Sequence, residues 1–166
     1  MCVDPGGGSV AAGAAQDLGL IEGYFGRPWT HEDRKQVLTR LRALGFSWFH
    51  YAPKADAFLR RRWREPHPPD AMAELADLSA HCRSLGMRFG LGLSPYELYR
   101  EPSRTAMADF IARIRALEQI GLDELAILFD DTRGDVPDLA AREAEIVHAA
   151  LDATRARRVL MCPTYY

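Results

Sequence analysis

The sequence has few of the features that mark several large classes of protein. Its 166 residues include only three cysteines, Cys2, Cys82 and Cys162, which lie far apart and form no CxxC pair. Isolated cysteines in odd number indicate neither a disulfide framework nor a zinc site, and they are typical of a reducing compartment. Neither positive nor negative charge dominates, because 21 basic and 23 acidic residues leave a formal net charge of −2. This balance provides no electrostatic footprint for nucleic acid or for an anionic membrane.

Long hydrophobic runs are also missing, and none approaches the roughly 18 apolar residues of a membrane-spanning helix. Residues 1–16 are rich in Gly and Ala and lack the basic start and leucine-rich core of a secretory signal. We therefore expect a flexible tail over residues 1–16 and a cytoplasmic protein, with secretion left open. The full 166-residue chain is 48% hydrophobic and 27% charged, a composition typical of one globular domain that can bury a core without disulfide or metal.

Short apolar runs alternate with longer amphipathic segments from Asp17 onward. Runs rich in Leu, Ile, Phe and Val predict strands buried on both faces of a parallel sheet, and they cover residues 18–22, 46–51, 87–93, 125–129 and 159–162. The intervening segments place apolar residues three or four apart, which predicts helices that pack one face on the sheet. These helices are expected around residues 37–44, 72–85, 107–117 and 139–151.

Residues at the expected helix ends agree with this order. Thr30 followed by Asp33 predicts a capping box at the start of the first helix. Gly45, Gly86 and Gly121 each follow the last apolar turn of a helix, where a residue with left-handed backbone conformation is favoured.

The element order predicts an α/β fold of alternating strands and helices with all strands parallel. Gly23, Lys54, Ser94, Asp130 and Thr164 follow successive strands at intervals of 31 to 40 residues. This regular period is compatible with a doubly wound sheet or with a (β/α)₈ barrel. A full barrel needs about 250 residues, so the chain is either an open five-stranded sheet or the N-terminal part of a barrel.

The carboxyl ends of the expected strands carry the chemistry-bearing residues, as parallel α/β folds require. Aromatic rings, the cation of Lys54 and the carboxylates of Asp130 and Asp131 converge there. Sugar rings present apolar faces and hydroxyl edges, so aromatic platforms beside carboxylates indicate a carbohydrate site.

The adjacent carboxylates of Asp130 and Asp131 are the sharpest feature. Two carboxylates this close do not both ionise easily, so we expect one to be protonated near neutral pH and suited to general acid catalysis. A solvated turn and a Mg²⁺ ligand pair remain alternatives. Neighbours on a strand point to opposite faces, so both reach one pocket only if the strand has already ended.

Other polar residues give weaker signals. Taken alone, Lys54 is more often a solvated loop residue, and the run Arg60–Arg64 is interpreted as a solvated loop because Glu65 adjoins it and the chain is slightly acidic. The five histidines share no ligand spacing, so we assign them no role and expect no metal. Ser94 lacks the glycines of a nucleophile elbow, which leaves serine hydrolase chemistry unsupported.

Six sequence blocks, in order from about residue 18 to the end, resemble glycoside hydrolase family 84. This family contains the protein O-GlcNAcases and bacterial β-N-acetylglucosaminidases, some of them named hyaluronidases. The blocks are Gly19–Thr30, Tyr51–Lys54, Trp63–Glu65, Leu91–Pro95, Leu128–Asp131 and Cys162–Thr164. The resemblance implies that residues 17–166 are the N-terminal part of a (β/α)₈ catalytic domain, with five strands and four helices present.

The resemblance also implies a mechanism, which is retaining hydrolysis through an oxazoline formed by the substrate's own acetamido oxygen. Asp130 resembles the carboxylate that orients the acetamido group, and Asp131 the general acid and later base. Lys54 and the carbonyl of Gly23 match positions that bind sugar hydroxyls, and Tyr166 matches a tyrosine that supports the acetamido group. This is a substrate-assisted exception to the two-carboxylate scheme.

The chain departs from the family pattern in two blocks and in extent. It has Tyr24-Phe25 where the family usually has Phe-Tyr, which turns the hydroxyl to the other side, and Ala55 replaces a loop aspartate. Family residues that grip the sugar from later strands have no counterpart.

The expected function is a β-N-acetylglucosaminidase that needs no cofactor and acts on a glycan or glycoprotein carrying N-acetylglucosamine. The alternatives are a non-catalytic carbohydrate-binding remnant of the fold and, more distantly, a Mg²⁺-dependent phosphotransfer protein. Because a partial barrel leaves sheet edges open, we also expect self-association.

Overall fold

The computed structural model describes residues 17–165. The tail expected over residues 1–16, which contains Cys2, and the candidate site residue Tyr166 lie outside the described residues. The elements, in order, are β1 (Gly19–Glu22), α1 (His31–Ala43), β2 (Trp48–Tyr51), the 3₁₀ helix η1 (Ala57–Leu59), α2 (Pro69–Ser84), β3 (Arg88–Leu93), η2 (Leu98–Arg100), α3 (Arg104–Leu117), η3 (Glu118–Ile120), β4 (Glu124–Leu128), α4 (Leu139–Ala153) and β5 (Arg158–Cys162).

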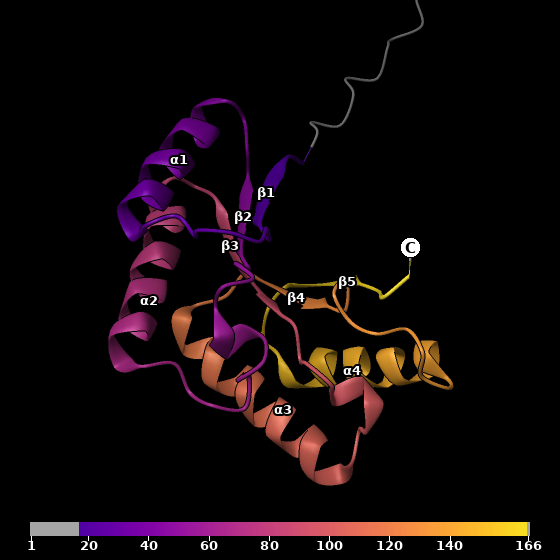
Figure 1. The fold of residues 1–166 in the computed structure, drawn as a ribbon. Coiled ribbons are helices and arrows are strands. Elements are labelled where there is room, and N and C mark those ends of the chain that lie inside the picture. Colours follow the sequence, from indigo (N-terminus) through magenta and orange to yellow (C-terminus); the bar gives the residue numbers. More distant parts are fainter. Residues whose placement is uncertain (1–16, 166) are drawn as a thin grey trace, which may run out of the picture.

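The five strands form one parallel sheet in the order β1-β2-β3-β4-β5. A doubly wound sheet reverses its strand order at a switch point and places helices on both faces. Here the order never reverses, and the four helices cover one face of a curved sheet (Figure 1). The architecture is therefore that of a partial (β/α)₈ barrel, and the doubly wound alternative is excluded.

The two faces of the sheet pack differently. Toward the helices, alternate residues such as Phe49, Phe89 and Ile127 are fully buried in the main core. The concave face, which corresponds to the interior of a barrel, has a smaller apolar layer that includes Ala52 and Leu128. Alternation along each strand explains the division, because successive side chains point to opposite faces.

Helix ends follow the chemistry expected from the sequence. Thr30 accepts a hydrogen bond from the amide of Asp33, whose carboxylate accepts one from the amide of Thr30, so the capping box is confirmed. Gly45, Gly86 and Gly121 have φ angles of 91°, 67° and 82°, a backbone region that favours glycine because it has no Cβ.

An ionic network centred on the buried side chains of Glu124 and His50 joins the strands at their amino ends on the concave face. The Glu124 carboxylate, 1% exposed, accepts hydrogen bonds from Nε2 of His50 at 2.7 Å and Nε of Arg88 at 2.6 Å. Arg158 pairs with Glu124 at 3.2 Å, and both arginines also pair with Asp17. Burial holds the pKa of His50 below its usual value, although the Glu124 carboxylate opposes that shift.

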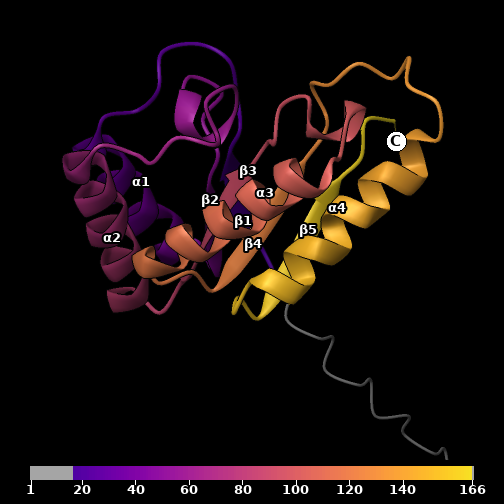
Figure 2. The same ribbon diagram turned by 90° about the horizontal axis from the view of Figure 1, so that it is seen from below.

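The strand-to-helix loops gather along the opposite rim (Figure 2). The open ends of the sheet are β1 and β5, and apolar side chains are exposed there. Ile21 on β1 is 42% exposed and Met161 on β5 is 41% exposed. Within residues 17–165, no helix is both long and apolar enough to cross a bilayer.

Candidate active site

Asp130, Asp131 and Lys54 come together at the carboxyl ends of β2 and β4. Because β4 ends at Leu128, both aspartates lie beyond the strand and are free of its alternation. The Nζ atom of Lys54 is 2.9 Å from Oδ2 of Asp130 and 2.5 Å from Oδ2 of Asp131. The Lys54 side chain is only 5% exposed, so the interpretation of this lysine as a solvated loop residue is wrong.

A second cation and an aromatic ring complete this cluster. Nη2 of Arg60 lies 3.6 Å from Oδ2 of Asp131, and its side chain is 14% exposed. The ring of Phe25, from the loop after β1, lies 5.2 Å from the guanidinium carbon of Arg60 and 5.9 Å from Nζ of Lys54. The solvated-loop interpretation of the Arg60–Arg64 run is therefore wrong for Arg60.

The loop after β1 approaches the same cluster. The amide of Lys54 donates to the carbonyl of Tyr24 at 3.4 Å. This bond places Gly23, next to Tyr24 in sequence, beside the loop after β2 that carries Lys54, called the lysine loop below. The Tyr24 ring packs edge-on against Trp29, and its hydroxyl donates to the carbonyl of Arg27. As expected from the exchanged Tyr24-Phe25 order, the phenylalanine rather than the tyrosine faces the cations.

Two partly buried threonines and the buried Glu143 hold the turn that carries the two aspartates. Thr132 donates to the carbonyl of Phe129 at 2.7 Å, and its hydroxyl lies 2.6 Å from that of Thr164. Thr164 in turn donates to the buried carboxylate of Glu143 on α4 at 2.5 Å. The residue immediately before Asp130 is thus tied to β5 and to α4.

The lysine loop has its own buried support. The Asp56 carboxylate accepts hydrogen bonds from Nε2 of His67 and from the hydroxyl of Tyr51, both at 3.1 Å, and from the amide of Phe58 at 2.9 Å. Burial raises the pKa of Asp56, but the bonds from His67 and its other donors outweigh burial and leave that pKa below its usual value. Arg113 on α3 donates to Nδ1 of His67 at 2.6 Å, which extends the chain of bonds to α3.

Sequence reasoning missed three of these residues. Arg60 stood within a charged run, and its place beside Asp131 depends on the loop's path. His67 and Glu143 carry no motif that distinguishes them from other polar residues. The only sequence signals were the position of His67 in a proline-rich loop and the position of Glu143 in an expected helix.

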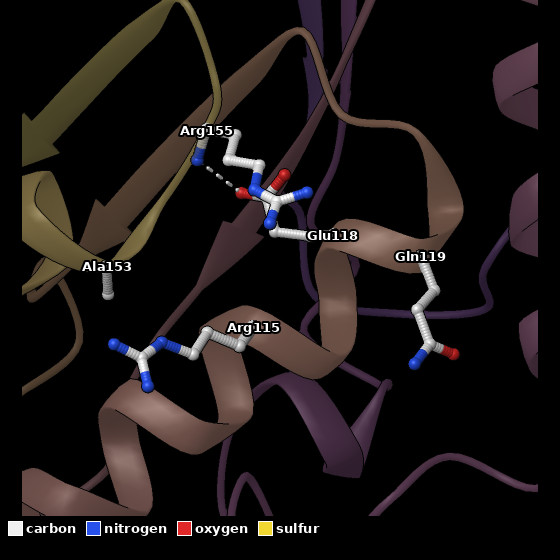
Figure 3. Close-up of a pocket in the computed structure, with 5 residues that line it drawn as sticks. All are labelled: Arg115, Glu118, Gln119, Ala153 and Arg155. Atoms are coloured by element: carbon white, nitrogen blue, oxygen red, sulfur yellow. Dashed lines mark hydrogen bonds between the residues drawn. The ribbon is translucent and has the colours of Figure 1, made fainter.

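A separate hollow of about 310 Å³ lies at the other end of the sheet, between the ends of α3 and α4 (Figure 3). Its lining includes the exposed side chains of Arg115 and Arg155. Glu118 lies between them and accepts hydrogen bonds from the amide of Arg155 and the hydroxyl of Thr154. Because catalytic groups of parallel barrels lie at the carboxyl ends of strands, this hollow is not part of the candidate site.

Within the part of the chain that the structure describes, no three histidine, cysteine or acidic side chains lie together as a metal site would require. The cluster at the rim is therefore one of two carboxylates, two cations and an aromatic ring. This arrangement provides carboxylates for proton transfer and charge stabilisation, and a cation that can donate to hydroxyl groups.

Comparison with known proteins gives consistent results. A family model described as β-N-acetylglucosaminidase matches residues 18–166. Protein O-GlcNAcases from Rattus norvegicus and Mus musculus are each 28% identical, over 96% and 94% of this chain. A solved mutant of Thermobaculum terrenum O-GlcNAc hydrolase has 26% identity and a TM-score of 0.81 over 91% of this chain.

The chain spans only part of these relatives. It covers 19% and 18% of the two O-GlcNAcases and 35% of the hydrolase chain. The five strands and four helices therefore match one portion of a larger catalytic fold. Since the family model extends over nearly the whole chain, the chain belongs to the β-N-acetylglucosaminidase family, the glycoside hydrolase family 84 that its sequence blocks resemble.

Proposed function

We propose that this chain carries the catalytic carboxylates of a glycosidase that removes terminal N-acetyl-β-D-glucosamine by substrate-assisted, retaining hydrolysis. The observation that carries the proposal is the contact of Lys54 with both Asp130 and Asp131 at the rim where barrel active sites lie. The names of the relatives, which are protein O-GlcNAcases and an O-GlcNAc hydrolase, support a sugar attached to protein as the substrate.

Each group has a role that its chemistry allows. In the first step, Asp131 donates a proton to the glycosidic oxygen while the acetamido oxygen attacks the anomeric carbon and the leaving group departs. Asp130, ionised, stabilises the positive charge that develops on the acetamido group. In the second step, Asp131 accepts a proton from water, which opens the oxazoline with net retention of configuration.

Lys54 supports this sequence by position. Its ammonium lies 2.9 Å from the Asp130 carboxylate and 2.5 Å from that of Asp131. We propose that it turns its donors to a sugar hydroxyl on binding, beside the carbonyl of Gly23, while the hydroxyl of Tyr166 supports the acetamido group. The match of the β-N-acetylglucosaminidase family model to residues 18–166 favours the glycosidase over the phosphotransfer alternative.

The experiment compares an aryl N-acetyl-β-glucosaminide with the matched aryl β-glucoside, which lacks the acetamido group. The chain is assayed alone and together with a polypeptide that supplies the remaining strands of the barrel. We expect hydrolysis of the first substrate only, with the β-anomer as the initial product by NMR. Equal hydrolysis of both substrates would show that an enzyme carboxylate is the nucleophile and would reject the substrate-assisted mechanism.

The remnant hypothesis makes a different prediction for the same experiment. A binding protein that has lost turnover would hydrolyse neither substrate after the barrel is completed, yet it would still bind N-acetylglucosamine. Binding is measured by titration calorimetry, with Asp130→Asn as the variant that weakens contact with the acetamido group.

A further inference from the structure

The arginine-rich loop after β2 has an unusual arrangement of guanidinium groups on aromatic rings. Arg61 lies 5.6 Å from the centre of the Tyr96 ring, Arg62 lies 4.5 Å from that of Phe58, and Arg64 lies 4.2 Å from that of Trp63. A guanidinium held over a ring keeps the N–H donors on its edge available for a carboxylate.

These arginines differ in how their charge is compensated. Arg62 forms a two-point ion pair with Glu65, through Nε at 2.9 Å and Nη2 at 2.5 Å. Arg64 lies 3.7 Å from Asp109. Arg61 is exposed and has no carboxylate within 4 Å among residues 17–165. Its charge is therefore available to a binding partner.

The position of Arg61 is fixed by the fold. The side chain of Trp63 is fully buried, and its Nε1 donates to the carbonyl of Tyr96 at 3.2 Å. This bond ties the arginine loop to the loop after β3, which provides the ring beneath Arg61. A preorganised guanidinium loses less freedom on binding than a mobile one.

The same loop passes beside the candidate site. Arg60, next to Arg61 in sequence, lies 3.6 Å from Oδ2 of Asp131. Residues 54–65 contain five basic and two acidic side chains, whereas the whole chain has a net charge of −2. Lys54, Arg60, Arg62 and Arg64 each lie within 4 Å of a carboxylate, so the uncompensated positive charge of this segment is that of Arg61. A polypeptide that crosses the rim meets Arg61 within a few residues of the sugar-bearing side chain, because an extended chain advances about 3.3 to 3.6 Å per residue.

We propose that Arg61, stacked on Tyr96, binds a carboxylate of the polypeptide that carries the sugar, so that the site prefers acidic segments beside the glycosylated residue. The proposal rests on the glycosidase function proposed above and adds a class of substrate to it. Charge complementarity favours an acidic peptide, and carboxylate with guanidinium is a pairing that gives both orientation and specificity.

The test measures binding rather than turnover. Fluorescein-labelled, unglycosylated peptides with alternating Glu and Gly are compared with matched Gln-Gly peptides by fluorescence anisotropy on the full 166-residue chain. We expect tighter binding of the acidic peptide, weakened by added salt. Arg61→Gln should reduce its affinity about two- to fivefold, as expected for one exposed ion pair, and should remove the preference over the Gln peptide.

Arg115→Gln is the matched control, because it removes the same charge from an exposed arginine at the opposite end of the sheet (Figure 3). It should leave binding of the acidic peptide unchanged. Arg61→Lys keeps the charge without the planar fork and should give intermediate affinity. Equal losses in Arg61→Gln and Arg115→Gln, or full affinity in Arg61→Lys, would overturn the proposal.

Three further outcomes separate this proposal from others. If an oligosaccharide of glucuronic acid binds in an Arg61-dependent manner and the acidic peptide does not, the surface recognises an anionic glycan and the peptide proposal is rejected. If the completed barrel shows no turnover but the peptide result holds, only the glycosidase proposal fails. Normal turnover without an acidic preference rejects the Arg61 proposal alone.

Discussion

At the scale of single residues, the sequence predicted that three candidate residues meet at one rim, but it did not predict their surroundings. Lys54, Asp130 and Asp131 follow expected strands, and carboxyl ends of parallel strands meet at one rim, so their convergence could be anticipated. The approach of Arg60 to Asp131 could not. It depends on the path of an irregular loop anchored by the buried Trp63, and such a path has no periodic pattern in sequence.

The separate roles proposed for the two aspartates lead to a prediction at this scale. In the completed barrel, Asp131→Asn should slow hydrolysis of substrates with poor leaving groups far more than that of activated aryl glycosides, which need little protonation. Asp130→Asn should slow both, because oxazoline formation needs its carboxylate with any leaving group. The measurement is kcat/KM against leaving-group pKa for each variant. Equal losses across the series for Asp131→Asn would contradict the assignment of the general acid.

At the scale of elements, the helix ends and strand order followed from the sequence, while some strand starts did not. We expected strands to begin at Leu125 and Val159, but β4 and β5 begin one residue earlier, at Glu124 and Arg158. Charged residues are rarely buried unless paired, so strand bounds taken from runs of apolar residues leave out charged residues such as Glu124 and Arg158. Here Glu124 pairs with Arg158 and with His50 across the sheet, and this compensation is visible only once the strands are assembled.

The same network predicts how stability depends on pH. Burial raises the pKa of Glu124, but the bonds from Arg88 and His50 outweigh it and leave that pKa below its ordinary value of 4.5. Burial lowers the pKa of His50 below 6.5. For both groups the unfolded chain binds more protons in acid, so their contribution to stability is present at neutral pH. It should be lost as the pH falls, first through the histidine range and then below 4.5.

Urea unfolding followed by tryptophan fluorescence between pH 7 and pH 4 tests this dependence. Glu124→Gln should be less stable at pH 7 and should show a shallower loss of unfolding free energy on acidification. Glu145→Gln, at an exposed position of α4, is the control and should keep the slope of the unchanged protein. If Glu124→Gln also keeps that slope, the network does not determine the acid response.

At the scale of the whole molecule, the open sheet is the dominant feature. Edge strands β1 and β5 each present unpaired N–H and C=O groups, and exposed apolar side chains such as Ile21 and Met161 lie beside them. A closed barrel has no such edges. We therefore expect the isolated 166-residue chain to self-associate and to show no measurable turnover of an aryl N-acetyl-β-glucosaminide.

Size-exclusion chromatography with light scattering, combined with the same assay, tests this expectation. Adding a polypeptide with the remaining strands should restore a single species and bring activity. A monodisperse monomer that hydrolyses the substrate by itself, and loses that activity in Asp131→Asn, would show that half of the barrel is sufficient. It would leave the family assignment intact.

The ionic network around Glu124 and the carboxylate cluster around Asp131 lie at opposite ends of the sheet. The apolar layer around Ala52 and Leu128 lies between these two polar clusters. Substitutions in the two clusters share no contacts, so their effects should add. Natural selection can then act on the clusters one at a time. A lineage that loses Asp131 keeps the buried pairs that hold its strands together, and the inactive descendant remains a folded scaffold on which a new binding site can evolve.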